Sequence, residues 1–194
     1  MKRSCFLGIL LLSIFLLVGC GNSDRKSTGL FLFSADDFKK AESFTKEHED
    51  DLLVLRYPQN WREEMPVMGA KFIIMKEDYV HAPNTSMNIV QRKSDPRFAD
   101  ASIETIKKEF PKALLSKGIT KVKFVQIQRD TWQDQLGMCM EYTGSYKGEE
   151  IHYMQYFRDN GKNITVITFT IDEREWQETE NEVKSIAASI IFTD

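Results

Sequence analysis

Hydrophobic and polar residues alternate along the second half of the chain with the two-residue period of β-strands. Four such segments follow one another, and turn-forming residues such as Lys147-Gly148 separate them. The strongest turn signal is Asn160-Gly161, because these residues tolerate the positive φ angles of a two-residue hairpin. The pattern predicts an antiparallel meander over residues 122–130, 136–143, 151–158 and 163–171.

Three apolar runs in the first half predict further strands, since residues that form turns bound each of them. Pro58 ends the first run, because proline cannot donate a hydrogen bond to a neighbouring strand. A turn-rich segment, residues 81–85, separates the second run from the third. The runs are residues 51–57, 70–77 and 86–93.

Residues 34–48 fit two interpretations. Ser34 and Asp37 have the spacing of a capping box, and the apolar residues after them keep helical spacing. Residues 44–48 also fit a strand that turns through residues 49–51 into the next one. We expect a short helix followed by that strand.

Two longer helices are expected, one between the groups of strands and one at the C-terminus. Asp100 or Ser102 caps the first, and Pro111 must end it, kink it or begin a second turn. Asp172 and Glu175 form a capping box for the second. The inward faces comprise Ile103, Ile106 and Phe110 in the first helix, and Trp176, Val183, Ile186, Ala187 and Ile190 in the second. This order of elements predicts an α+β fold, a largely antiparallel β-sheet covered by helices, over residues 34–194.

The N-terminal segment has a different pattern. Lys2 and Arg3 precede an apolar run of about 15 residues, shorter than the roughly 20 that a spanning helix needs. Residues 1–19 therefore fit a signal peptide. The ending "LVGC" resembles the lipobox of bacterial lipoproteins, which implies cleavage before Cys20 and lipidation of its sulfur. Polar residues follow, so residues 20–33 are expected to form a flexible tether.

Composition and charge exclude some classes of function. The formal charge is −3, and no basic stripe with interleaved aromatic residues occurs, so nucleic-acid binding is not expected. There are three cysteines, and Cys5 lies within the expected leader. With Cys20 lipidated, Cys139 has no partner and a disulfide is not expected. The lipobox thus predicts a chain held by lipid on the extracytoplasmic side of a cell membrane or outer membrane.

The remaining polar residues contain no recognised catalytic or metal-binding motif. The three histidines form no HExxH pair, and no nucleophile elbow, phosphate loop or CxxC occurs. Cys139 and His152 lie on neighbouring predicted strands, so a Cys–His pair is conceivable, although a buried thiol and an ordinary histidine are expected. Met138 and Met140 alternate with Tyr142 as core residues would, rather than as copper ligands. We expect no catalytic site, no metal site and no cofactor.

Several short motifs resemble the PsbP-like superfamily, which includes DcrB-type lipoproteins and a Ran-binding protein. These motifs are "YPQNW" after an early strand, "NTSMNI" on a later one, "VITFTI", and a terminal helix that runs into "ASIIF". The resemblance covers about residues 45–194. It implies an α/β/α sandwich with a non-enzymatic binding or assembly role, and names no partner.

The same motifs supply the candidate binding residues. An aromatic side chain just after Pro58 caps the end of the sheet, or it lines a cleft between sheet and loop beside polar contacts. The candidate cleft residues are Tyr57, Trp61, Arg62, Asn84 and Arg92. We expect a lipid-anchored protein that binds an envelope protein partner. The alternative is an extracytoplasmic protein that binds a small molecule or metal.

Overall fold

A computed structural model describes residues 33–67, 69–77, 85–96 and 100–193. The expected leader, Cys20, nearly all of the expected tether and Asn84 lie outside these residues. The lipobox prediction is therefore not addressed by the structure.

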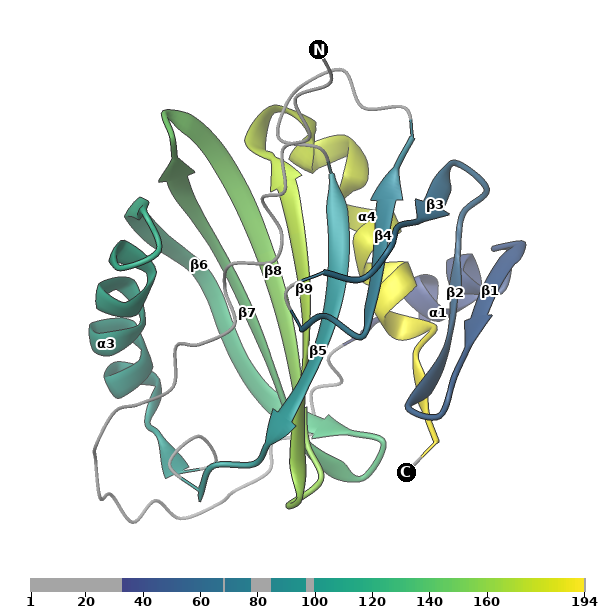
Figure 1. The fold of residues 1–194 in the computed structure, drawn as a ribbon, viewed down its shortest axis with the longest axis horizontal. Helices are drawn as coiled ribbons and strands as arrows, with labels where there is room; N and C mark the ends of the chain where they lie inside the picture. Colours follow the sequence, from purple (N-terminus) through teal and green to yellow (C-terminus); the bar gives the residue numbers. More distant parts are fainter. Residues whose placement is uncertain (1–32, 68, 78–84, 97–99, 194) are drawn as a thin grey trace.

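Seven strands form one antiparallel sheet in the order β3-β4-β5-β9-β8-β7-β6 (Figure 1). Strands β6 to β9 are neighbours in sequence and in space, which confirms the predicted meander. Gly161, in the turn from β8 to β9, has a φ of +83°, as the Asn-Gly hairpin requires. The strands are β3 (Trp61–Glu63), β4 (Phe72–Lys76), β5 (Ser86–Lys93), β6 (Ile119–Trp132), β7 (Gln135–Tyr146), β8 (Glu149–Asp159) and β9 (Asn163–Asp172).

A second, smaller antiparallel sheet has the order β1-β2-β10. Asp50 shapes the turn between β1 and β2, because its carboxylate accepts hydrogen bonds from the backbone N–H groups of Leu52 and Leu53 at 2.8 and 2.9 Å. Residues 34–48 hold both expected elements, a helix and then a strand. The strands are β1 (Lys46–Glu49), β2 (Leu53–Tyr57) and β10 (Ile191–Phe192).

Helices cover both faces of the main sheet (Figure 1). Helix α3 (Ile103–Leu115) packs on one face, and α1 (Ala35–Ala41), α4 (Trp176–Ala188) and the small sheet pack on the other. This arrangement confirms the predicted α+β fold with an antiparallel sheet between helical layers. None of the helices among the described residues is long and apolar enough to span a membrane.

Each face of the sheet contributes to a separate hydrophobic core. On the α3 side, Ile106, Phe110 and Leu114 pack against β6 to β9. Met138 and Met140 belong to this core and are 1% and 0% exposed, as their alternation predicted. On the α4 side, residues of the small sheet and α4 pack against β3 to β9; they include Leu53, Leu55, Phe192, Trp176, Val183 and Ile186.

The start of the C-terminal helix differs from the prediction. Asp172 and Glu175 do not form a capping box; a 3₁₀ turn, η1 (Glu173–Glu175), precedes α4 instead. Asp172 accepts a hydrogen bond from the backbone N–H of Arg174 at 2.9 Å, and Glu175 accepts one from the Thr85 hydroxyl at 3.1 Å. Asp172 therefore caps the 3₁₀ turn rather than α4, and the Glu175 carboxylate bonds to Thr85 instead of completing the box.

Pro111 lies inside α3, which runs on to Leu115. Proline removes one backbone donor, but packing of Phe110 and Leu114 into the core maintains the helix on both sides of it. Of the two possible caps, Ser102 is used: its hydroxyl accepts a hydrogen bond from the N–H of Thr105 at 3.1 Å.

Candidate functional site

The two aromatic residues of the predicted cleft lie inside the α4-side core. Trp61 is fully buried, and its indole N–H donates to Glu182 of α4 at 2.8 Å. Tyr57 is 4% exposed and donates its hydroxyl to Glu63 at 2.8 Å. Burial and this contact raise the pKa of the Tyr57 phenol. Both rings therefore join the edge of the main sheet to the layer that covers it.

The two arginines of the predicted cleft lie on the other face of the sheet. Arg62 is exposed and pairs with Glu64 at 2.8 Å. Arg92 is partly buried; this burial lowers the pKa of its guanidinium, although the charge of Asp95 opposes the change. Arg62 aligns through β4 with Ser86 at the start of β5, and Arg92 lies six residues further, about 20 Å along the strand. The structure does not bring these four residues together.

Cys139 and His152 share a face of the sheet but do not meet. Cys139 lies opposite Tyr156, whereas His152 lies opposite Thr143, four residues or about 13 Å along β7. Burial raises the pKa of the Cys139 thiol to about 12, and the charge of Glu141 adds to this effect. A buried neutral thiol far from the imidazole is not an activated nucleophile.

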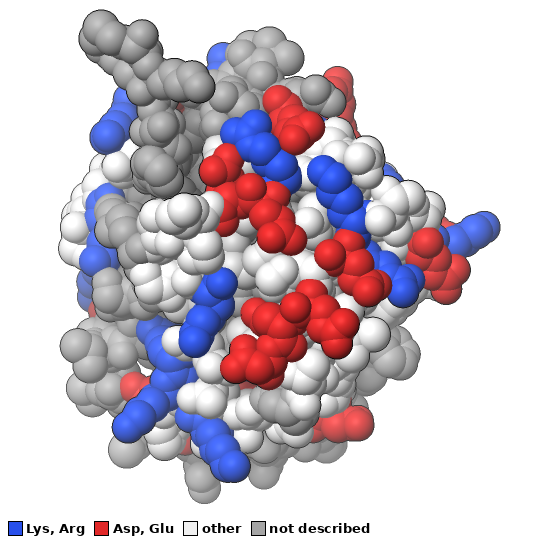
Figure 2. Space-filling view, turned by 45° about the vertical axis from the view of Figure 1, so that its right-hand side comes forward, with Lys and Arg blue, Asp and Glu red and all other residues white. Residues whose placement is uncertain are grey.

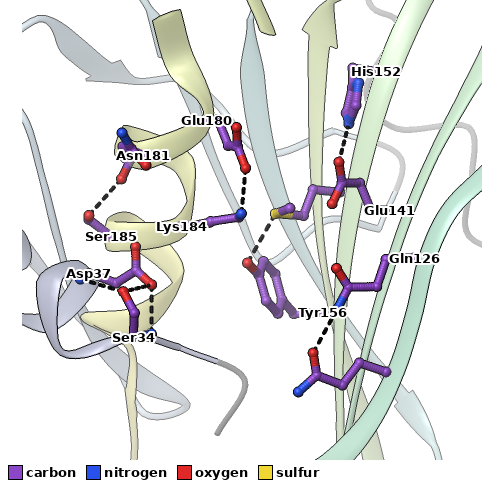
Figure 3. A network of polar contacts seen from close by, with 12 residues as sticks. Ser34, Asp37, Gln126, Glu141, His152, Tyr156, Glu180, Asn181, Lys184 and Ser185 are labelled. Atoms are coloured by element: carbon purple, nitrogen blue, oxygen red, sulfur yellow. Dashed lines mark hydrogen bonds and ion pairs between the residues drawn. The ribbon is translucent and has the colours of Figure 1, made fainter. Parts of the chain in front are cut away.

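A network of charged side chains occupies the space between α4 and the sheet (Figure 3). His152 is at its sheet end, with Nε2 at 3.0 Å from the Glu141 carboxylate and Nδ1 at 2.9 Å from the Glu173 carboxylate. The indole ring of Trp176 stacks on the imidazole at 3.7 Å between ring centroids. Both ring nitrogens are occupied by carboxylates, so neither is available to a substrate or a metal ion.

Lys184 points from α4 toward the sheet in the same network (Figure 3). Its ammonium group pairs with Glu180 of the same helix. Burial acts to lower the pKa of Lys184, but the bond to Glu180 and the charges of Glu141 and Asp37 outweigh it and raise the pKa. Lys184 is thus held as a cation among carboxylates.

A second group of polar residues lies on the α3 side, in the middle of the main sheet. Strand pairing places them in two adjacent rows on β8, β9 and β5: Tyr153, Thr170 and Ser86, and then Gln155, Thr168 and Asn88. We call these six residues the polar block. Every member is at most 8% exposed, and none carries a charge.

Some polar atoms at the block have no partner among the described residues. Gln155 donates to the Thr168 hydroxyl at 2.9 Å, but its own side-chain oxygen accepts no hydrogen bond. The hydroxyl of Thr170 and that of the adjacent Tyr142 are also buried without partners. Buried polar atoms in proteins nearly always have a partner, which makes the block the strongest candidate for a ligand site in this fold.

The surface carries a mixture of charges on the side of β1, β2 and β3. Figure 2 shows acidic side chains gathered there, with lysines and arginines between them. Some are paired, as Glu47 with Arg56 at 2.9 Å. Large apolar side chains that are exposed are dispersed over different elements and include Phe38, Met65, Leu115, Val125 and Ile191.

No protein-family model matches the chain, and no curated protein matches its sequence. Solved structures do match its fold. Cyanobacterial PsbP (CyanoP) from Synechocystis sp. PCC 6803 superimposes with a TM-score of 0.59 and 12% identity, over 88% of this chain and 98% of that one. LpqN, involved in cell envelope biogenesis of Mycobacterium tuberculosis, superimposes with a TM-score of 0.56 and 12% identity, over 84% of this chain and 98% of that one.

The Ran-binding protein Mog1p of Saccharomyces cerevisiae is also similar, with a TM-score of 0.50 and 10% identity over 78% of this chain and 97% of that one. Each of these three chains is covered almost completely, so the likeness concerns the whole domain rather than one motif. At 10–12% identity the likeness establishes architecture alone. The described domain has a PsbP-like fold, as the sequence motifs predicted.

Proposed function

We propose that this chain is a lipid-anchored bacterial envelope protein whose PsbP-like domain binds or assembles a protein partner outside the cytoplasm, without catalysis. The observation that carries the proposal is the "LVGC" motif at residues 17–20, followed by a polar segment that leads into this domain. Proteins with the same fold include a Ran-binding protein and one involved in cell envelope biogenesis. The charged groups between α4 and the sheet add support, since Lys184 and His152 pair with carboxylates rather than with a reactive centre.

The test is site-specific photo-crosslinking of the full-length chain in intact cells. One photoreactive residue replaces Glu49, which is exposed on β1, and another replaces Lys108, which is exposed on α3. Because these positions lie on opposite sides of the main sheet, a specific partner should give a discrete product at one position and not at the other. Identical weak smears at both positions would contradict a specific protein partner.

The polar block favours a second candidate function, the binding of a small uncharged molecule. The buried side-chain oxygens of Gln155 and Thr170 have no partner among the described residues, which costs stability that a hydrogen-bonding ligand would restore. A charged ligand fits less well, because the block offers no counter-ion to a buried charge.

The Thr170→Val variant distinguishes a ligand-binding role of the polar block from a purely structural one, because valine keeps the shape of threonine and removes the hydroxyl. If the block binds a ligand, native mass spectrometry of the wild-type protein should show a co-purified small molecule that the variant lacks. Thr165→Val is the matched control, since Thr165 is equally buried on β9 but faces the opposite side. Two results together would rule the ligand out. Mass spectrometry would show no adduct on the wild-type protein or either variant, and Thr170→Val would be more stable than the wild type by about 1–3 kcal/mol.

A further inference from the structure

The two sides of the main sheet carry opposite net charges. Residues 103–123, which form α3 and the start of β6, contain six lysines and two glutamates. On the other side, residues 46–57 and 173–188 form β1, β2, η1 and α4, and they contain nine acidic and four basic residues. The whole chain has a charge of −3, so the positive charge of the α3 side is a local feature.

Lysines and apolar side chains gather where α3 ends. Leu115 is 61% exposed on the outward face of the helix, one turn after Lys112. Lys117 follows in the turn into β6, and Ile119 of β6 pairs with Tyr146, next to the β7–β8 hairpin. Figure 1 shows the end of α3, the start of β6 and this hairpin at the same end of the molecule. We define the basic patch as Lys112, Leu115, Lys117, Lys121, Tyr146 and Lys147.

The lysines of the basic patch are only partly neutralised. Lys112 and Lys121 pair with glutamates at 2.9 and 3.9 Å. Lys117 and Lys147 form no ion pair within the described parts of the chain, and the Lys147 ammonium lies over the Tyr146 ring at 5.2 Å from its centroid. The aliphatic stems of such lysines cover apolar surface, while their ammonium groups stay free to meet anions.

An anionic lipid surface suits the basic patch better than an acidic protein does. Leu115 is its one largely exposed apolar side chain, whereas a protein interface usually has a contiguous apolar centre. Anionic headgroups attract lysines without any matching shape, and a leucine can enter the headgroup layer beside them. If Cys20 holds the chain in a bilayer, this contact is an intramolecular event that needs little affinity of its own.

The expected tether is long enough for this contact. Phe33, the first described residue, packs against Trp132 with 5.4 Å between ring centroids. Trp132 ends β6, so Phe33 lies at most about 43 Å along that strand from Ile119, beside the basic patch. The thirteen residues from Cys20 to Phe33 span about 43–47 Å when fully extended. Cys20 can therefore stay in a bilayer that the basic patch also touches.

We propose that the basic patch rests on the anionic headgroups of the bilayer that holds Cys20, so that the acidic side formed by β1, β2 and α4 faces away from the membrane. This inference rests on the proposed function, because it needs the lipid anchor. It also deepens that function, since the orientation leaves the acidic side open to the protein partner.

The test is lysine footprinting of the full-length protein, extracted from membranes and reconstituted into vesicles. Neutral vesicles contain phosphatidylcholine alone, and anionic vesicles contain in addition about 30% phosphatidylglycerol. An amine-reactive ester labels the lysines, and peptide mass spectrometry gives the rate at each one. Lys39, Lys40 and Lys162 are internal controls, because they are exposed on α1 and in the β8–β9 hairpin, away from the basic patch.

We expect Lys117 and Lys147 to be labelled at least about threefold more slowly on anionic than on neutral vesicles, with the control lysines unchanged. Salt at about 1 M should remove the difference, because it shortens the Debye length to about 3 Å. In the variant Lys112→Gln/Lys117→Gln/Lys147→Gln, the remaining Lys121 should lose its protection. In the matched control Lys39→Gln/Lys40→Gln/Lys162→Gln, which removes the same charge elsewhere, Lys121 should keep it.

The anchor and the orientation can fail separately in this experiment. A chain that does not float with neutral vesicles would contradict the lipid anchor and, with it, the proposed function. A chain that floats with both kinds of vesicle, but whose patch lysines are labelled equally on both, would overturn only the orientation. Protection of these lysines in intact cells but not on anionic vesicles would also overturn it, and would assign the basic patch to an acidic protein.

Discussion

Trp61→Ala is expected to destabilise the domain by about 3–5 kcal/mol, the usual cost of removing a large buried aromatic side chain. Trp61 is fully buried between β3 and α4, although β3 is a three-residue edge strand. The substitution removes packing and also leaves Glu182 without the indole N–H that it accepts at 2.8 Å. The loss should appear in urea unfolding followed by circular dichroism.

Two control variants distinguish packing from other effects. Trp61→Phe keeps an aromatic ring but loses the N–H, so it should cost about 1–3 kcal/mol. Arg62→Ala changes the next residue, which is exposed on the opposite face, and should cost less than about 0.5 kcal/mol. A Trp61→Ala protein as stable as the Arg62→Ala protein would show that Trp61 is not a core residue.

Cys20→Ser is expected to abolish lipid labelling and maturation at this position. The thioether to a diacylglycerol requires the cysteine sulfur, and serine offers none. Stable anchoring needs two or three acyl chains, because one chain alone binds membranes marginally. Cells grown with a labelled fatty acid, then fractionated and immunoblotted, provide the measurement. Cys5→Ser is the control, since Cys5 lies within the expected leader and should leave labelling unchanged. Label retained on the Cys20→Ser protein would exclude lipidation at this residue.

Elements with a strong local pattern could be predicted from the sequence. Strand β9 consists mostly of β-branched residues and follows an Asn-Gly turn, and it lies between two neighbours in the centre of the sheet. Ser34 and Asp37 form the expected capping box. The Ser34 hydroxyl accepts from the Asp37 N–H at 3.2 Å, and the Asp37 carboxylate accepts from the Ser34 N–H at 2.8 Å. In both cases the stabilising contacts are local, so a short window of sequence contains them.

Elements that depend on distant contacts could not be predicted. Strand β10 has two residues, and it is held by bonds from far along the chain. The side chain of Gln133, in the turn from β6 to β7, donates to Ile190 at 2.6 Å and accepts from the Phe192 N–H at 3.0 Å. Nothing near Phe192 in the sequence signals a partner 59 residues away.

The polar block was missed for a related reason. Thr168 and Thr170 alternate with apolar residues as in an ordinary half-exposed strand, and Gln155 and Asn88 look the same on their own strands. Only the register of β5, β9 and β8 shows that these positions adjoin one another and are buried. The contact between Glu141 and His152 likewise depends on the pairing of β7 with β8.

The lipid anchor determines the proposed location of the domain, and the intact mass of the protein extracted from membranes tests it most directly. The predicted mass is that of residues 20–194 plus a diacylglyceryl group, with or without one further acyl chain on the new amino terminus. Fragmentation should place the whole addition on Cys20. A chain that retains residues 1–19, or one cleaved elsewhere with an unmodified Cys20 thiol, would contradict the account.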